Sequence, residues 1–191
     1  MKTSKIKLSN VIFLVVILLL IIPQTRQPIQ VFIQKGFAMI SPSKTEESAQ
    51  KQLSDYQWEL VDQDGNILNF KDVKGKVVFL NFWATWCPPC IAEMPSIDAL
   101  YQDYNEEVVF LLVSNENANK VKQFLSDNEY NLNYYNTLTV APKVLSSNSI
   151  PQTYVIDKYG KIRIEKNGAA NWNSDTVRNL LNELLKSEYP L

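Results

Sequence analysis

The chain has 191 residues, of which 46% are hydrophobic, and a formal net charge of −1 at pH 7. It contains two cysteines and no histidine. These values are typical of one packed domain with an additional segment, and they exclude a histidine metal site, a C-x-x-C-H haem attachment and a Cys-His nucleophilic pair. A zinc site with four ligands would need carboxylates or a second chain. The charge gives no indication of nucleic-acid binding.

The first 40 residues are basic and strongly apolar, with five basic residues and no acidic one. Residues 11–22 form an unbroken apolar run that Pro23 ends, and lysines precede it. This pattern is typical of a signal-type segment, on the short side for a spanning helix. The preceding lysines predict that the N-terminus stays in the cytoplasm. We therefore expect a retained signal anchor in the cell membrane, with cleavage as the alternative, and a domain on the extracytoplasmic (periplasmic) side.

A second, weaker apolar stretch covers residues 28–40, and it either extends the anchor or lies along the membrane surface. Residues 41–52 are mostly polar and are typical of a linker. We therefore divide the chain into an anchor and juxtamembrane segment (1–40), a linker (41–52) and a folded domain (53–191).

The folded domain begins with a predicted β-hairpin. Residues 56–61 alternate like a strand, residues 64–66 form a turn, and residues 67–70 form the return strand. The apolar run over 76–82 then predicts a buried strand, and a helix is expected from Pro88 to about Tyr104.

The two cysteines, Cys87 and Cys90, lie at C-x-x-C spacing between this strand and this helix. The spacing alone would also suit half of a zinc site or a structural disulfide, but at a strand-to-helix turn it is typical of a redox dithiol. Unpaired N–H groups and the helix dipole favour a thiolate at a helix start, so we predict that Cys87 is the nucleophile. Cys90 lies about one turn later and is the predicted resolving thiol.

Two prolines, Pro88 and Pro89, separate the cysteines. Each suits a first helical turn, but each also removes an N–H donor that could have stabilised the thiolate. We therefore expect Cys87 to be less acidic than in strongly oxidising dithiols, which favours a reductant or isomerase over an oxidase.

The remaining pattern alternates strands and helices and ends in a helix that Ser174 is expected to cap. The expected elements are a strand at 107–114, a helix at 117–128, a short strand and short helix within 131–149, strands at 153–157 and 162–165, and a helix after 174. This order predicts an α/β three-layer sandwich of the thioredoxin type with an N-terminal β-hairpin extension.

Several motifs resemble the TlpA/ResA-type branch of the thioredoxin-like superfamily, which consists of membrane-anchored, extracytoplasmic thiol–disulfide oxidoreductases. The motifs are Gly75-Lys76-Val77-Val78, Asn81 to Cys90, Glu93-Met94-Pro95, Ile150-Pro151-Gln152-Thr153 and Ile156 to Ile162. The resemblance covers about residues 53–186.

The resemblance implies roles for residues outside the dithiol. Pro151 matches a cis proline beside the cysteines, and the backbone at Ile150 would pair with substrate peptide, with Trp86 also in the substrate-binding set. Cytosolic thioredoxins carry a buried aspartate where this chain has Asn81. Glu93 resembles the family's replacement, a half-buried carboxylate with a raised pKa that shuttles the proton of the resolving thiol.

The function that the resemblance implies is reduction or exchange of disulfides in exported proteins, with cytochrome c maturation as one such task. Its partners would be protein thiols and disulfides, a membrane thiol relay as electron donor, and the membrane through the N-terminal anchor. We expect no cofactor, because the chain has no nucleotide-binding glycine motif, and no metal or nucleic acid. A thiol peroxidase of the peroxiredoxin type and a membrane-tethered peptide-binding module without turnover are the alternatives.

Overall fold

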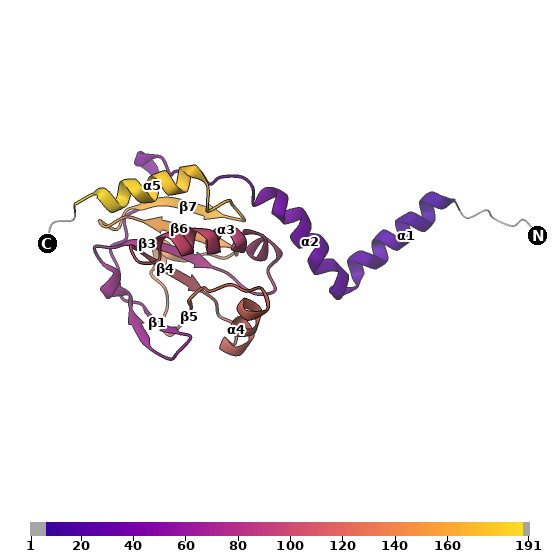
Figure 1. The fold of residues 1–191 in the computed structure, drawn as a ribbon, viewed down its shortest axis with the longest axis horizontal. Coiled ribbons are helices and arrows are strands. Elements are labelled where there is room, and N and C mark those ends of the chain that lie inside the picture. The colour runs from indigo at the N-terminus through magenta and orange to yellow at the C-terminus, as the bar shows by residue number, and fades with distance from the viewer. Residues whose placement is uncertain (1–6, 189–191) are drawn as a thin grey trace, which may run out of the picture.

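The structure is a computed structural model that describes residues 7–188. A seven-stranded sheet with the order β2-β1-β5-β4-β3-β6-β7 forms its centre (Figure 1). The strands are β1 (Glu59–Asp62), β2 (Ile67–Asn69), β3 (Val77–Phe82), β4 (Val108–Val113), β5 (Tyr134–Thr137), β6 (Gln152–Ile156) and β7 (Ile162–Asn167). β3, β4 and β5 are parallel neighbours, and the other pairs are antiparallel. The fold is therefore mixed α/β, and β1 and β2 form the predicted N-terminal hairpin.

The interior strand β3 is apolar along most of its length because both faces of the sheet are covered. Val77 and Phe79 belong to the core cluster on one face, whereas Val78 and Leu80 belong to the cluster on the other. Successive side chains of a strand point to opposite faces, so a strand buried on both sides appears as a continuous apolar run. This run places β3, and the loop that follows it, at the middle of the fold.

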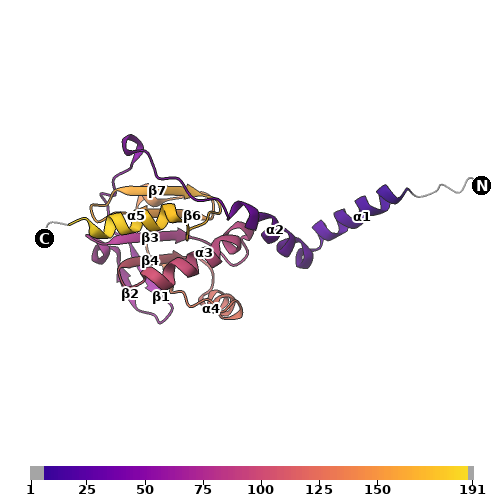
Figure 2. The same ribbon diagram turned by 45° about the horizontal axis from the view of Figure 1, so that its top comes forward.

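Three helices supply the core on the first face. They are α3 (Pro88–Tyr104), α4 (Ala118–Asp127) and α5 (Asp175–Lys186). Figure 2 shows α3 and α5 crossing in front of the sheet. Their inward residues recur at helical spacing, as in Ile97 and Leu100 of α3 and Leu180 and Leu184 of α5.

A three-layer sandwich was expected, with helices on both faces of the sheet, but the second face lacks an α-helix among the described residues. In the part of the chain that the structure describes, this face is covered by short 3₁₀ turns and connections, not by an α-helix. Phe70 lies in η2 (Phe70–Val73), Leu145 lies in η3 (Lys143–Leu145), and Trp58 precedes β1. The short strand and short helix expected within 131–149 are β5 and η3, and η3 is a three-residue 3₁₀ turn.

The N-terminal region consists of α1 (Leu8–Ile21) and α2 (Pro23–Phe37). Pro23 ends the first helix and begins the second, because proline disfavours helical backbone before it but suits a first turn. Figure 1 shows α1 projecting away from the sheet and α2 lying beside the domain. Within residues 7–188, no helix is both long enough and apolar enough to cross a membrane.

The segment predicted to be a linker lies along the domain and is hydrogen-bonded to it. The N–H of Thr45 donates to Arg163 O at 2.9 Å, and Lys51 O accepts from the N–H of Ile162 at 3.0 Å. A further short turn, η1 (Glu47–Ala49), lies between these contacts. Ser174 precedes α5 as predicted, but its hydroxyl bonds to Ser41 Oγ at 2.8 Å and does not cap the helix.

Candidate active site

The two cysteines lie at the start of α3 and are joined by a disulfide. Cys87 is the N-cap residue, with extended backbone, and Pro88 is the first residue of the helix. Cys87 Sγ accepts a hydrogen bond from the N–H of Cys90 at 3.3 Å. Both prolines lack an N–H, so Cys90 carries the first such donor of the helix. The sulfur of Cys87 therefore occupies the helix-start position from which its nucleophilic role was predicted.

The disulfide is almost closed off from solvent. Cys87 is 2% exposed and Cys90 is fully buried, whereas Trp86 directly before them is 59% exposed. Trp83 and Ala84 are also buried and belong to the same core cluster as the cysteines. A partner must therefore approach past the exposed Trp86.

Glu93 is completely buried, which corrects the expectation of a half-buried carboxylate. Its Oε1 accepts from Asn81 Nδ2 at 2.9 Å, and its Oε2 accepts from Trp172 Nε1 at 2.9 Å and from the N–H of Ala170 at 3.2 Å. The connection between β7 and α5 closes over the carboxylate, which the sequence pattern did not reveal.

Burial raises the pKa of Glu93 to about 8, and its three hydrogen-bond donors offset part of the rise. A carboxyl group with this pKa changes its protonation state near the pH at which thiols exchange. It lies one helical turn after Cys90, so a titratable proton is held in the same buried region as the resolving thiol.

The peptide bond between Ile150 and Pro151 is cis, as the resemblance implied. Gln152, the next residue, pairs with Phe82 at the end of β3. Pro151 therefore lies beside the C-terminal end of β3, and the chain continues from that end of β3 toward Cys87. Its carbonyl accepts from the N–H of Gly168 at 2.9 Å, which ties it to the end of β7.

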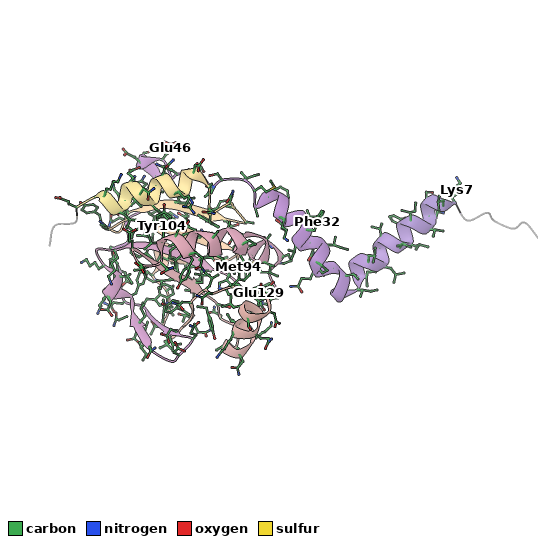
Figure 3. All side chains as sticks on the ribbon, in the orientation of Figure 1. Lys7, Phe32, Glu46, Met94, Tyr104 and Glu129 are labelled. Carbon is green, nitrogen blue, oxygen red and sulfur yellow. A yellow bond between two sulfur atoms is a disulfide. The ribbon has the colours of Figure 1, made fainter. Side chains whose placement is uncertain are left out.

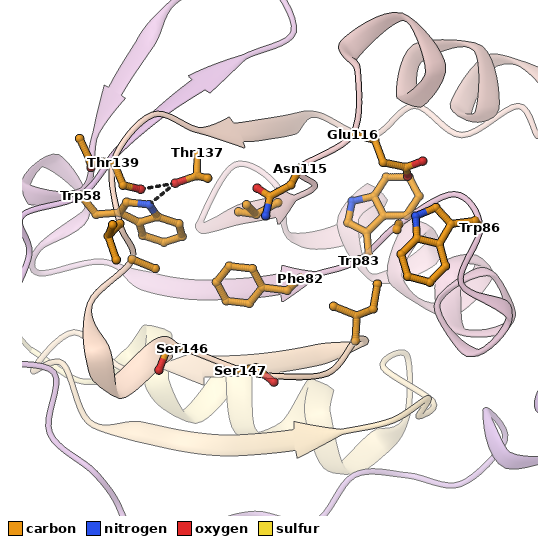
Figure 4. Close-up of a pocket in the computed structure, with 15 residues that line it drawn as sticks. Trp58, Phe82, Trp83, Trp86, Asn115, Glu116, Thr137, Thr139, Ser146 and Ser147 are labelled. Atoms are coloured by element: carbon orange, nitrogen blue, oxygen red, sulfur yellow. Dashed lines mark hydrogen bonds between the residues drawn. The ribbon is translucent and has the colours of Figure 1, made fainter.

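A cavity of about 520 Å³ lies beside the catalytic loop, which is the segment 83–87 between β3 and α3 (Figure 4). Four aromatic side chains line it, with Trp83 and Trp86 near one end, Phe82 in the middle and Trp58 at the other end. Ile150 also lines it, so the structure brings together two of the three residues predicted to contact substrate, Trp86 and Ile150. An elongated apolar cavity of this size can accept side chains of a peptide.

Glu116 is a site residue that the sequence reasoning missed. Its carboxylate accepts from the N–H of Thr85 at 2.5 Å and from Thr85 Oγ1 at 2.9 Å, and it pairs with Lys120 Nζ at 2.6 Å. Burial raises its pKa, but the bonds from Lys120 and Thr85 outweigh this and lower it overall. Glu116 thus fixes the loop two residues before Cys87. The parallel pairing of β3 and β4 could have indicated this, because residues after parallel neighbours meet at one edge.

Among residues 7–188, no three His, Cys, Asp or Glu side chains are arranged to hold a metal ion. The groups of this site that can react are its two sulfurs and the buried acid. The arrangement suits thiol–disulfide exchange, since Cys87 is the slightly more exposed cysteine and Cys90 lies fully buried next to it.

Comparisons with known proteins agree with this geometry. Residues 49–164 match the family model of the AhpC/TSA family. A thiol-disulfide oxidoreductase ResA of Bacillus cereus is 38% identical over 112 residues, which is 56% of this chain and 63% of that protein. ResA of Bacillus thuringiensis subsp. konkukian is 33% identical over 136 residues, covering 69% of this chain and 74% of the relative.

A solved structure assigned as a thiol-disulfide oxidoreductase from Bacteroides vulgatus superposes with a TM-score of 0.55 at 33% identity, over 66% of this chain and 90% of that one. The match to the first ResA relatives spans 61% to 63% of their length. The chain therefore belongs to the AhpC/TSA family, with the thioredoxin-like fold, and within it to the ResA-type thiol-disulfide oxidoreductases.

Proposed function

We propose that this protein is an extracytoplasmic thiol–disulfide oxidoreductase that reduces or exchanges disulfides in exported proteins. The observation that carries the proposal is the Cys87–Cys90 pair at the start of α3, with cis-Pro151 at the adjoining sheet edge and the buried Glu93 one turn behind. ResA-type membership supports the same chemistry.

The reaction begins from the reduced dithiol. The Cys87 thiolate attacks one sulfur of a substrate disulfide, that S–S bond breaks, and the other substrate sulfur leaves as a thiolate that takes up a proton. Cys90 then loses its proton and attacks Cys87 Sγ. This step forms the Cys87–Cys90 disulfide and releases the second substrate thiol, so two electrons have passed to the substrate.

Glu93 is proposed to accept the proton that Cys90 loses and to return it when the dithiol is reduced again. With its pKa raised to about 8 by burial, it can exist as an acid or a carboxylate near neutral pH. Asn81 donates to one carboxylate oxygen and cannot itself titrate, so the proton is assigned to Glu93. Trp86 and Ile150 would contact the substrate at the cavity beside the loop.

The protein is proposed to be anchored in the cell membrane by its N-terminal segment, with the domain on the extracytoplasmic side. Lysines precede the apolar run, and large apolar side chains along α1 are exposed, from Leu8 at 74% to Leu19 at 40%. Re-reduction would come from a membrane thiol relay. Cytochrome c maturation is the task that the resemblance suggests.

The experiment that tests the proposal is reduction of insulin disulfides by the reduced protein, followed alongside the rate of hydrogen peroxide consumption. The proposal expects insulin reduction that is lost in the Cys87→Ser/Cys90→Ser double variant, with peroxide consumed no faster than by free thiols. Rapid peroxide consumption would instead favour a thiol peroxidase. A biological role that survives in the double variant would favour a peptide-binding module without turnover.

A further inference from the structure

Helix α2 has a glutamine face that lies against the catalytic loop. Gln27, Gln30 and Gln34 recur at a spacing that places them on one side of a helix. Gln27 Nε2 donates to the carbonyl of Thr85 at 3.3 Å. All three glutamines also line a cavity of about 620 Å³ that Trp86 lines from the loop. The polar side of α2 therefore contacts protein, two residues before the nucleophilic cysteine.

The other side of α2 is apolar and largely exposed, although Ile29 on it is half-buried. Ile29, Phe32 and Ile33 share this side at i, i+3 and i+4. Phe32 is 78% exposed, and Ile33 is 57% exposed although it borders the glutamine-lined cavity. Figure 3 shows Phe32 on the part of α2 between the domain and α1. This is the reverse of a helix that packs on a soluble core, where the apolar side faces inward.

Two further observations identify what covers the apolar side. First, exposed apolar side chains continue along α1, where Phe13 is 65% and Leu14 is 59% exposed, and α1 directly precedes α2 (Figure 1). Second, Lys35 and Arg26 lie on α2, Arg26 at the rim where the helix also borders the glutamine-lined cavity, and residues 1–40 contain no acidic residue. Basic side chains beside an apolar face are typical of helices that lie in the interface of an anionic bilayer.

We infer that α2 lies in the headgroup boundary of an anionic membrane, with Phe32 toward the acyl chains and the glutamine face on the catalytic loop. A helix with its side chains is about 10 Å across, so the dithiol is held roughly one helix diameter from the lipid. This deepens the proposed function and rests on its membrane anchor. It also keeps Cys87 close to the membrane in which the proposed thiol donor would lie.

The test is photo-crosslinking of the full chain in vesicles of phosphatidylcholine and phosphatidylglycerol. One protein carries p-benzoylphenylalanine in place of Phe32, and two matched controls carry the same residue in place of Gln34 or Gln30, on the domain-facing side. After illumination, the intact mass reports lipid adducts, and peptide mapping reports protein adducts. The inference expects a mass gain of one phospholipid from position 32, and crosslinks to the domain without lipid from positions 34 and 30.

Crosslinks from position 32 to a second copy of the chain, or no lipid adduct there, would overturn the inference, as would lipid adducts from positions 34 and 30. Two further measurements distinguish a failure of this inference from a failure of the proposed function. Flotation of the unmodified chain with the vesicles tests the anchor of the proposed function, and insulin reduction tests its chemistry. A protein that floats and reduces insulin but gives no lipid adduct at position 32 contradicts only the placement of α2.

Discussion

Glu93 is the residue whose environment most directly links structure to chemistry. It is fully buried, yet it accepts three hydrogen bonds, from Asn81, Ala170 and Trp172. Those bonds favour the carboxylate, whereas burial disfavours it more strongly and brings the pKa to about 8. A buried acid with a pKa in this range is suited to exchange a proton with a thiol.

Replacement of this acid tests the proton role. In Glu93→Gln, insulin reduction is expected to slow by about 10- to 100-fold, as for the loss of a general acid–base group, and the pH dependence of the rate is expected to lose the contribution of Glu93 near pH 8. The measurement is the rate from about pH 5 to pH 9 in both proteins. The exposed Glu106→Gln serves as a matched control and should leave the profile unchanged. Superimposable profiles for the wild type and Glu93→Gln would leave the proton to water.

The raised pKa of Glu93 predicts how the free energy of unfolding depends on pH. The folded protein holds the Glu93 proton up to a pKa of about 8, whereas the unfolded chain releases it near the ordinary value of 4.5. Because the folded state binds more protons in this interval, the free energy of unfolding contributed by Glu93 falls as pH rises through it. Denaturant unfolding of the oxidised protein at several pH values should show this decline, and Glu93→Gln should flatten it. An unchanged slope in the variant would contradict the raised pKa.

At the scale of elements, the site depends on the ends of two parallel strands. The loop after β3 carries Thr85 and the dithiol, and the loop after β4 carries Glu116, which accepts both hydrogen bonds from Thr85. Glu116 is a positioning residue, because its contact is with Thr85 and not with the sulfurs.

Loss of that carboxylate should loosen the catalytic loop. Glu116→Gln replaces one of the two acceptor oxygens with an NH₂ group that faces a donor, so the free energy of unfolding is expected to fall by about 1–3 kcal/mol. Amide exchange at Thr85 should rise at the same time. Lys120→Gln removes the exposed partner of the ion pair but keeps both Thr85 bonds, so it should cost less than about 1 kcal/mol. Equal effects of the two substitutions would mean that the ion pair, not the loop contact, matters.

The elements that sequence reasoning placed correctly are those with local signals. The apolar run of β3, the proline-initiated start of α3 and the hairpin turn at Gly65, whose φ is +87°, follow from residues close together in the chain. The contacts that sequence reasoning missed join segments far apart in the chain, such as Trp172 to Glu93 and Gln27 to Thr85. No periodicity in one segment reports which other segment will lie over it, so the full burial of Glu93 was not predictable.

At the scale of the whole molecule, residues 7–40 contribute little to the packed interior. Both core clusters of the domain consist of residues from Leu53 onward, and α2 meets the catalytic loop mainly through glutamines. The hydrogen-bonded stretch that includes Ser41 and Thr45 lies after this region. The described residues therefore separate into a folded domain and a helical N-terminal part that contacts the domain at the catalytic loop and at α3.

Removal of residues 1–40 should leave a folded and active domain. The truncated protein is expected to be soluble, to unfold cooperatively and to reduce insulin, because both core clusters remain complete. Circular dichroism during denaturant unfolding and the insulin assay are the measurements. A truncated protein that aggregates or loses activity would show that α2 is needed to hold the catalytic loop.

Cys87 is proposed to exchange disulfides with other proteins, and Cys90 to resolve the product. The most direct measurement is trapping of mixed disulfides in cells that express single-cysteine variants, resolved on non-reducing gels and identified by mass spectrometry. Cys90→Ser should accumulate partner proteins on Cys87, because the resolving attack is lost, and Cys87→Ser should accumulate none. Partners trapped by Cys87→Ser would invert the two roles, and the absence of trapped partners in both variants would contradict thiol–disulfide exchange as the function.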